Sequence, residues 1–242
     1  MKKAIQLIAI CSATTLLVAC GGGGDGGASV NTAEGLWQGT SSTGANVTVA
    51  ILENGEAWGG ATVGNTLVSA LAGTASGSGS SFSASGSEFV FSNNSVGTGS
   101  YKGSVAQKSR IQATSNNGST IDLAYNSYYD QGVTAAEIAG SYTLSGRTAR
   151  YSISNLNFTI GANGSFTIVD NGCTTTGTAT PRSSGKSIVN VNATGSGTCV
   201  LGNGVSLSGI AVLDKKVTPN TLYVIALNSA KTDGLVLIGA KN

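Results

Sequence analysis

The chain has 242 residues, of which 10% are charged, 36 are glycine, 2 are proline and none is histidine. This charge content lies well below the roughly 25% of an ordinary globular domain, but apolar residues still reach 40% and can form a core. The missing imidazole excludes serine–histidine–aspartate and cysteine–histidine nucleophilic systems, and also the common zinc hydrolase sites. The length allows one large or two small domains.

The N-terminal segment has the layout of a secretory signal peptide. Met1–Lys3 is basic, and the apolar stretch Ala4–Val18 is shorter than the roughly 20 residues that a membrane-spanning helix needs. The stretch ends in Leu17-Val18-Ala19-Cys20 and is followed by the glycine-rich run Gly21–Gly27. Leu17–Cys20 resembles the lipobox of bacterial lipoproteins, whereas the alternative is an ordinary secretory signal with a chance cysteine.

The lipobox resemblance implies how the mature chain is anchored. By this resemblance residues 1–19 are cleaved off, Cys20 carries the acyl chains, palmitate among them, and the lipid bilayer is a partner. Several acyl chains together give stable attachment to a membrane. The residue after the cysteine is Gly21 rather than aspartate, which is similar to the pattern in lipoproteins of the outer membrane. The resemblance does not specify whether the protein lies on the periplasmic or the outer face of that membrane. Residues 20–33 are expected to be the lipidated cysteine and a flexible glycine-rich tether.

Loss of the signal peptide changes the net charge of the chain. Lys2 and Lys3 leave, so the basic residues fall from 13 to 11 and balance the 11 acidic residues. Lys215-Lys216 is the only adjacent basic pair that remains. No basic patch for nucleic acid is therefore expected, and nucleic acid is not a predicted partner.

Two cysteines remain for the folded part. Cys11 lies in the signal peptide and Cys20 is the expected lipid site, which leaves Cys173 and Cys199. In an exported protein these two are expected to form a disulfide between neighbouring strands. A redox or metal pair is the alternative, but the chain has neither a CxxC spacing nor a histidine to support it.

Alternation of apolar and polar residues predicts an all-β fold. Asn54-Gly55 and Asn163-Gly164 each separate two alternating runs and predict hairpin turns, because both residue types tolerate positive φ. The number and spacing of the strands favour antiparallel structure. Further strands are predicted at Glu88–Phe91, Gly103–Ala106, Ser109–Thr114, Thr120–Tyr125, Ser187–Ala193, Val205–Leu213, Thr221–Leu227 and Leu235–Ile238.

The chain divides into two similar halves. Gly35-Leu36-Trp37 opens one half and Gly140-Ser141-Tyr142 opens the other, each followed by a strand, an Asn-Gly turn and a second strand. We predict an N-terminal β domain at 34–132 and a C-terminal β domain with the disulfide at 133–242. Each is a small barrel or sandwich, and the pair is a duplication or two halves of one sheet system.

Two segments depart from this strand pattern. Thr134–Ile138 is the one helical turn expected beyond the signal peptide. Gly73–Ser87 consists almost entirely of small residues, with little beyond Phe82 to bury, and is expected to form a surface loop or a poorly packed edge hairpin.

No cluster of residues indicates catalysis. Glu53 and Glu56 could serve as a glycosidase acid and base, but they flank a predicted turn where both would be solvated. Asp130-Gln131-Gly132 and Asp170-Asn171-Gly172 lack the dense spacing of a calcium loop. We therefore predict no enzymatic activity, no catalytic residues, no metal site and no cofactor.

Aromatic residues are the candidates for ligand binding. Trp37, Trp58 and Tyr142 either fill the core or line an aromatic pocket. Gly35-Leu36-Trp37 is similar to the Gly-x-Trp that opens the first strand of lipocalins, which implies a ligand-holding barrel. Ala136–Tyr142 resembles the entry to the barrel domains of transferrin-binding surface lipoproteins, although Ala139 departs from that pattern.

These observations together predict a lipid-anchored envelope protein with a non-enzymatic binding or structural role. Its partner would be an envelope or extracellular protein. One alternative is a carrier that holds a small apolar ligand inside a lipocalin-like barrel. A second alternative is a hydrolase of envelope polymers, which would need two carboxylates in one cleft.

Overall fold

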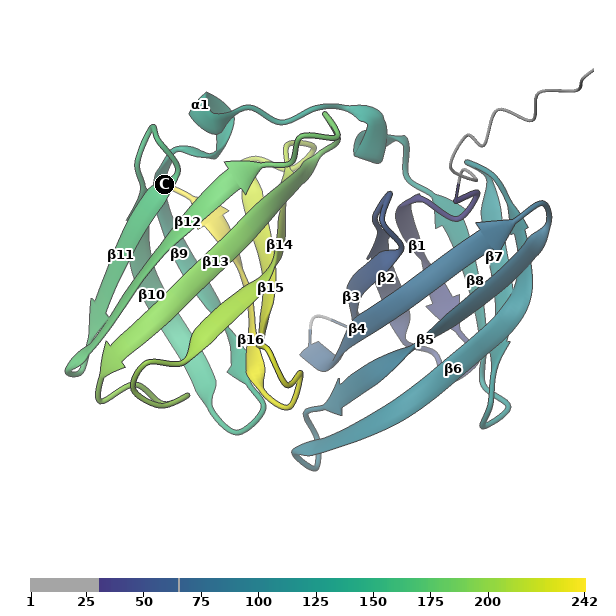
Figure 1. Cartoon of the computed structure of the whole chain (residues 1–242), viewed down its shortest axis with the longest axis horizontal. Helices are drawn as coiled ribbons and strands as arrows, with labels where there is room; N and C mark the ends of the chain where they lie inside the picture. The colour runs from purple at the N-terminus through teal and green to yellow at the C-terminus, as the bar shows by residue number, and fades with distance from the viewer. Residues whose placement is uncertain (1–30, 65) are drawn as a thin grey trace, which may run out of the picture.

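The described part of the chain folds into two closed antiparallel β-barrels of eight strands each (Figure 1). This computed structural model describes residues 31–64 and 66–242. The predicted signal peptide, the lipid site Cys20 and most of the predicted tether lie outside the described residues. The all-β fold with two antiparallel units is confirmed, and both units are barrels rather than sandwiches.

The first barrel is a meander in which each strand pairs with its neighbours in sequence, and β8 pairs with β1 to close the wall. The Asn54-Gly55 turn joins β2 to β3, as predicted. The strands are β1 (Gly35–Ser41), β2 (Asn46–Ile51), β3 (Glu56–Val63), β4 (Thr66–Ser78), β5 (Ser81–Val90), β6 (Ser95–Ala106), β7 (Arg110–Ser115) and β8 (Thr120–Tyr125).

The second barrel repeats this meander, and β16 pairs with β9 to close it. The Asn163-Gly164 turn joins β10 to β11. The strands are β9 (Gly140–Thr148), β10 (Ser152–Ile160), β11 (Ser165–Asp170), β12 (Cys173–Pro181), β13 (Ile188–Gly197), β14 (Ser206–Asp214), β15 (Thr221–Asn228) and β16 (Gly234–Lys241).

Residues 126–139 link the two barrels. They contain the 3-10 helix η1 (Ser127–Asp130) and the short helix α1 (Ala135–Ile138). The helix α1 confirms the helical turn predicted at Thr134–Ile138, whereas η1 is an additional turn that the sequence analysis does not predict. The Thr134 hydroxyl accepts a hydrogen bond from the Glu137 N–H, while the Glu137 carboxylate accepts one from the Thr134 N–H. Such a capping box fixes the start of a helix. We call the end of each barrel beside this segment the linker end, and the opposite end the far end.

Apolar side chains fill the inside of both barrels, and hydroxyl groups cover much of the outside. Clusters of buried apolar residues occupy the two interiors. On the outer face, cross-strand pairs of hydroxyl groups bond to each other, as in Thr194–Ser206 at 2.9 Å. Of the helices within residues 31–64 and 66–242, none is long and apolar enough to cross a membrane.

The prediction of a loop or edge hairpin at Gly73–Ser87 is wrong. The segment forms the adjoining parts of the long strands β4 and β5. β5 is paired on both sides within the barrel wall, whereas β4 pairs with β5 to Ser78 and with β3 only as far as Thr74. Gly73 and Gly86 lie opposite each other, and a Cβ built on Gly73 would lie 2.6 Å from the Gly86 Cα. The absence of side chains at this pair lets the two strands bend sharply together, which a small barrel requires. The composition predicts weak packing, but in the structure these small residues allow β4 and β5 to curve with the barrel wall.

Candidate functional site

An aromatic plug closes the linker end of the first barrel. The Trp37 side chain is fully buried, and its Nε1–H donates to the Ala33 carbonyl at 2.8 Å. Tyr125 meets the indole edge to face, with ring centroids 5.2 Å apart. Residue 35, two positions before Trp37, is a glycine, and a larger residue would not fit there because its Cβ would lie 2.5 Å from the Tyr125 ring. Trp37 thus has a place in the barrel interior.

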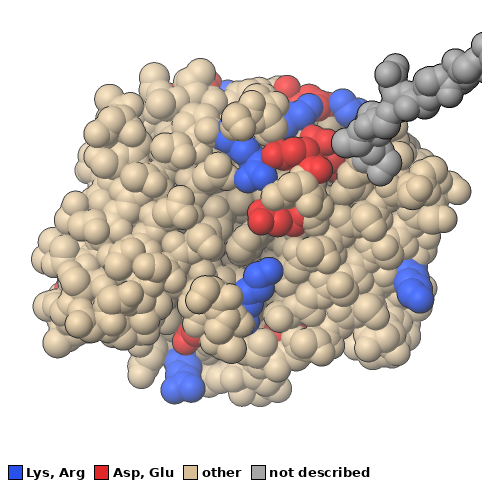
Figure 2. Space-filling view, viewed as in Figure 1, with Lys and Arg blue, Asp and Glu red and all other residues tan. Residues whose placement is uncertain are grey.

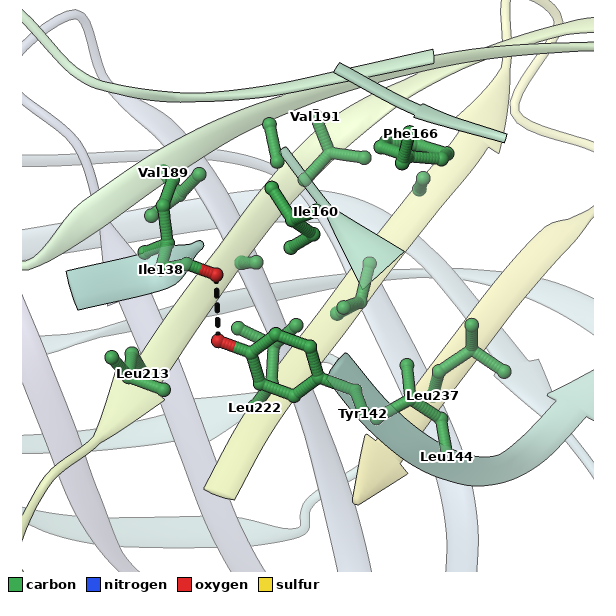
Figure 3. Close-up of a cluster of buried hydrophobic side chains, with 14 of the residues drawn as sticks. Ile138, Tyr142, Leu144, Ile160, Phe166, Val189, Val191, Leu213, Leu222 and Leu237 are labelled. Atoms are coloured by element: carbon green, nitrogen blue, oxygen red, sulfur yellow. Dashed lines mark hydrogen bonds between the residues drawn. The ribbon is translucent and has the colours of Figure 1, made fainter. Parts of the chain in front are cut away.

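The second barrel has an equivalent plug, Tyr142. Its side chain is fully buried, and its hydroxyl donates to the Ile138 carbonyl at 2.8 Å (Figure 3). The ring stacks on Phe158 with centroids 5.7 Å apart, and burial raises the pKa of Tyr142 to about 12. As with Trp37, the acceptor is the carbonyl four residues earlier in the chain. Both plugs hold the preceding segment over the barrel end.

Trp58 lies in a third environment. It projects from β3 on the outer wall of the first barrel, where it is buried among residues of both barrels. The three aromatic candidates therefore occupy two barrel interiors and one interface, and the fold does not bring them into a common pocket.

The interior of the second barrel contains a small apolar cavity of about 50 Å³, lined entirely by apolar side chains and Thr175. An apolar cavity of roughly 150 Å³ binds a ligand as small as benzene. Figure 3 shows the inward side chains of this barrel close together around the plug. The space left is therefore far smaller than a lipid or comparable apolar ligand.

An apolar interface, which we call the junction, joins the outer walls of the two barrels. Its first-barrel side is rich in aromatic residues, whereas its second-barrel side is aliphatic. Contiguous apolar burial of this kind holds domains in one arrangement. The junction consists of Leu36, Ala50, Leu52, Trp58, Ala70, Ala72, Phe89 and Phe91 from the first barrel, Tyr128 and Tyr129 from η1, and Ile188, Ile210, Ile225 and Leu227 from the second.

Polar atoms are also trapped in and beside the junction. Within the described residues, the buried side-chain polar atoms that lack a hydrogen-bond partner are Trp58 Nε1, Arg147 Nε, Ser184 Oγ and Ser187 Oγ. Arg147 lies over the Phe91 ring at 5.1 Å, which joins the two barrels by a cation–π contact. A buried polar atom without a partner destabilises the arrangement that buries it. The buried polar atoms in and beside the junction therefore have fewer of their hydrogen bonds formed than those in the two barrel interiors.

Asp130 forms a polar clamp at the linker end of the junction. Its carboxylate accepts hydrogen bonds from Lys186 at 2.8 Å, and from Lys108 and the Tyr125 hydroxyl at 2.9 Å each. These donors come from the second barrel, from the β6–β7 turn and from β8. The Lys186 bond, followed by that of Lys108, lowers the pKa of Asp130 well below its usual range. Figure 2 shows a group of charged side chains at the upper part of this seam, with a few others scattered over the rest of the face.

Further bonds cross the junction near the clamp. The Arg182 guanidinium donates to Glu53 at 2.7 Å, and the Ser187 N–H donates to the Tyr129 carbonyl at 3.0 Å. The Tyr128 hydroxyl donates to the Leu213 carbonyl. Glu53 is an exposed turn residue, as the sequence predicts, but it is also ion-paired with Arg182, which lies 129 positions later in the chain.

The predicted disulfide Cys173–Cys199 is confirmed. Cys173 begins β12 and Cys199 follows β13, so the bond ties two neighbouring strands at the far end of the second barrel. The bond is structural in this setting, since its surroundings are strand ends and a turn.

Metal-binding residues do not gather in the described part of the chain: no group of three or more cysteine, aspartate or glutamate side chains is close enough to hold an ion. Comparisons with protein families, with curated proteins and with solved structures find no match to this chain.

Proposed function

We propose that the protein is a lipid-anchored component of the bacterial envelope, of the outer membrane in particular, with a non-enzymatic binding role. The lipobox-like Leu17–Cys20 supports the anchor. Residue 32 enters the fold at the linker end, where the Thr32 N–H donates to the Gly77 carbonyl at 3.2 Å. An anchor at Cys20 would therefore hold the linker end toward the membrane and leave the far ends and outer walls to meet a partner.

The observation that carries the binding role is the combination of filled interiors and a fixed junction. The aromatic plugs and aliphatic side chains occupy the barrel interiors, and the junction and its clamp hold the barrels side by side. The molecule therefore offers mainly its outer surface. That surface is rich in hydroxyl and amide groups, which bind partners by adaptable hydrogen bonds.

Neither alternative has comparable support. A carrier of apolar ligands needs a cavity several times larger than the 50 Å³ in the second barrel. A hydrolase needs two carboxylates in one cleft, whereas Glu53 is ion-paired with Arg182.

We also infer that the two barrels derive from a duplicated unit. Each has eight strands in the same meander order, and each begins with a glycine two residues before its aromatic plug. The equivalent hydrogen bonds of Trp37 and Tyr142 support this reading.

The anchor is tested by fractionating cells that express the Cys20→Ala variant, with Cys11→Ala as the matched control. We expect Cys20→Ala to leave the membrane fraction and Cys11→Ala to remain in it. Retention of Cys20→Ala in membranes would contradict the anchor. Chemical crosslinking of the anchored wild-type protein should then capture a discrete envelope protein, and absence of any crosslinked partner would contradict the binding role.

A further inference from the structure

Half of strand β6 is a free sheet edge in an otherwise closed barrel wall. β6 pairs with β5 from Ser95 to Ser104, but it pairs with β7 only from Tyr101 to Ala106. In the part of the chain that the structure describes, no strand pairs with residues 95–100 on the β7 side. The β5–β6 hairpin therefore extends past the β7–β8 turn at the far end (Figure 1).

The hydrogen bonds of β6 show which backbone groups face this open side. The Val105 N–H donates to Ser80 on the β5 side, and the Ser100 carbonyl accepts from the Asn116 N–H on the β7 side, both at 2.9 Å. Backbone groups alternate between the two sides of a strand. The N–H and carbonyl groups of Val96 and Thr98 therefore point to the side where no strand pairs with them.

This edge lacks the features by which proteins protect free edges. Residues 95–100 contain no charge and no proline, and Val96 is 44% exposed. A Cβ built on Gly97 would meet no atom within 4 Å, so the face of the strand is open there, and residues 95–98 are all exposed. Natural edge strands are normally blocked by charges, proline or bulges, whereas an accessible edge is a template for another strand.

We propose that the Ser95–Gly99 edge of β6 binds an extended segment of a partner protein by strand addition. The segment exchanges backbone hydrogen bonds with Val96 and Thr98 and becomes the next strand beside β6. This inference rests on the proposed binding role and assigns it a site at the far end, away from the expected anchor.

The neighbouring side chains specify the chemistry of the segment. Gly97 pairs with Glu88 of β5, and both residues face the same side of the sheet. Within the described residues Glu88 has no ion-pair partner. Burial, and after it the charge of Glu88, raises the pKa of Tyr101. A partner residue opposite Gly97 can extend over the glycine toward this carboxylate. The segment that fits has one lysine or arginine at this position and β-branched residues on either side.

A second copy of the chain fits this edge less well. Two identical edges related by a two-fold axis pair antiparallel, which points their barrels in opposite directions. The linker ends would then lie on opposite sides of the pair. Ten residues separate Cys20 from Asn31 and can span at most about 40 Å, which disfavours anchoring both copies in one membrane.

The test uses the full-length chain with Cys20→Ala and a synthetic nine-residue peptide that alternates threonine and valine around a central lysine. Titration followed by fluorescence anisotropy should show saturable binding, and amide hydrogen exchange should slow at Val96 and Thr98. Thr98→Pro should weaken binding by about tenfold or more. Since the Thr98 N–H lies on the unpaired side of β6, proline removes no ladder bond of the fold.

Two controls isolate the backbone and charge contributions. The same peptide N-methylated on its edge-facing amides should not bind, which requires no change to the protein. Glu88→Gln should weaken binding of the lysine peptide but not of a norleucine peptide, whereas the matched variant Glu56→Gln at the linker end should change neither.

Absence of saturable binding, binding unaffected by Thr98→Pro, or self-association of the protein in place of peptide capture would each overturn the inference. A crosslinked envelope partner that contacts only other surfaces would also overturn it but would leave the proposed function standing. Membrane retention of Cys20→Ala would affect the anchor alone.

Discussion

The two barrels close their linker ends in the same way and their far ends differently. At the linker end, Trp37 and Tyr142 are both fully buried and both donate to the carbonyl four residues earlier. At the far end, a disulfide ties β12 to β13 in the second barrel, whereas β6 separates from β7 in the first. The shared end secures the fold, whereas both walls leave strand edges unpaired toward the far end. In the first barrel this edge is on β6, and in the second it lies between β10 and β11, which pair only at Thr159–Ile160 and Phe166–Thr167.

The largest expected effect comes from removing the shared plugs. Trp37→Ala and Tyr142→Ala should each lower the free energy of unfolding by about 3–5 kcal/mol, because each leaves a large cavity in a barrel interior. Urea unfolding monitored by circular dichroism measures both. Tyr142→Phe, which keeps the ring, should cost about 1 kcal/mol. A loss in free energy of unfolding below about 1 kcal/mol for either alanine variant would contradict the claim that the two plugs stabilise their barrels equally.

Removing the disulfide tests the difference at the far ends. Cys173→Ser combined with Cys199→Ser should lower the free energy of unfolding by about 2–4 kcal/mol, since the bond restricts the unfolded chain. Hydrogen exchange should quicken at the far ends of β12 and β13. The protection of β1–β8 against local opening should stay as in the wild type, and a uniform loss in both barrels would show that their far ends are coupled.

The clamp at Asp130 predicts a dependence on pH. Its folded-state pKa is lowered from 3.8 by Lys186 and Lys108, so its contribution is complete at neutral pH and is lost as the pH falls below about 4. Because the carboxylate is partly exposed, Asp130→Asn should cost at most about 1 kcal/mol at pH 7. The variant should also lose less stability than the wild type between about pH 4 and 2 in thermal unfolding. If the stability of the wild type and of Asp130→Asn fell in parallel over this pH range, ionised Asp130 would not stabilise the fold.

The smallest expected effect concerns the trapped guanidinium at the junction. Arg147→Met keeps much of the packing on Phe91 and removes the buried Nε that has no partner. The free energy of unfolding should change by less than about 1 kcal/mol or rise slightly. A loss above 2 kcal/mol would mean that the cation–π contact outweighs the cost of desolvation.

Local signals in the sequence predict most of the fold. Asn-Gly turns, alternation and the Thr134–Glu137 cap each act over a few residues, so their structural consequences can be predicted without tertiary information. The plugs were recognisable as Gly35-Leu36-Trp37 and Gly140-Ser141-Tyr142. Their hydrogen bonds were not predicted, because these depend on the path of the preceding segment.

The junction depends on contacts that local patterns do not specify, yet one signal for it was present. The run Leu222–Leu227 is almost continuously apolar, whereas a strand with one solvated face would alternate. Val224 faces the barrel interior, and Ile225 and Leu227 face the other barrel. The pair Glu53–Arg182 had no such signal, because two isolated charges 129 positions apart carry no pattern. The free half of β6 was missed because its strand length was underestimated.

An even number of strands in a meander has a practical consequence. Each barrel receives and releases the chain at its linker end, so its far end consists only of connections between adjacent strands. Turns such as Ser92–Asn94 and Asn116–Ser119 can therefore be lengthened or replaced without rerouting the chain. The far end is thus a natural place to insert foreign loops, which makes the molecule a scaffold for presenting inserted peptides.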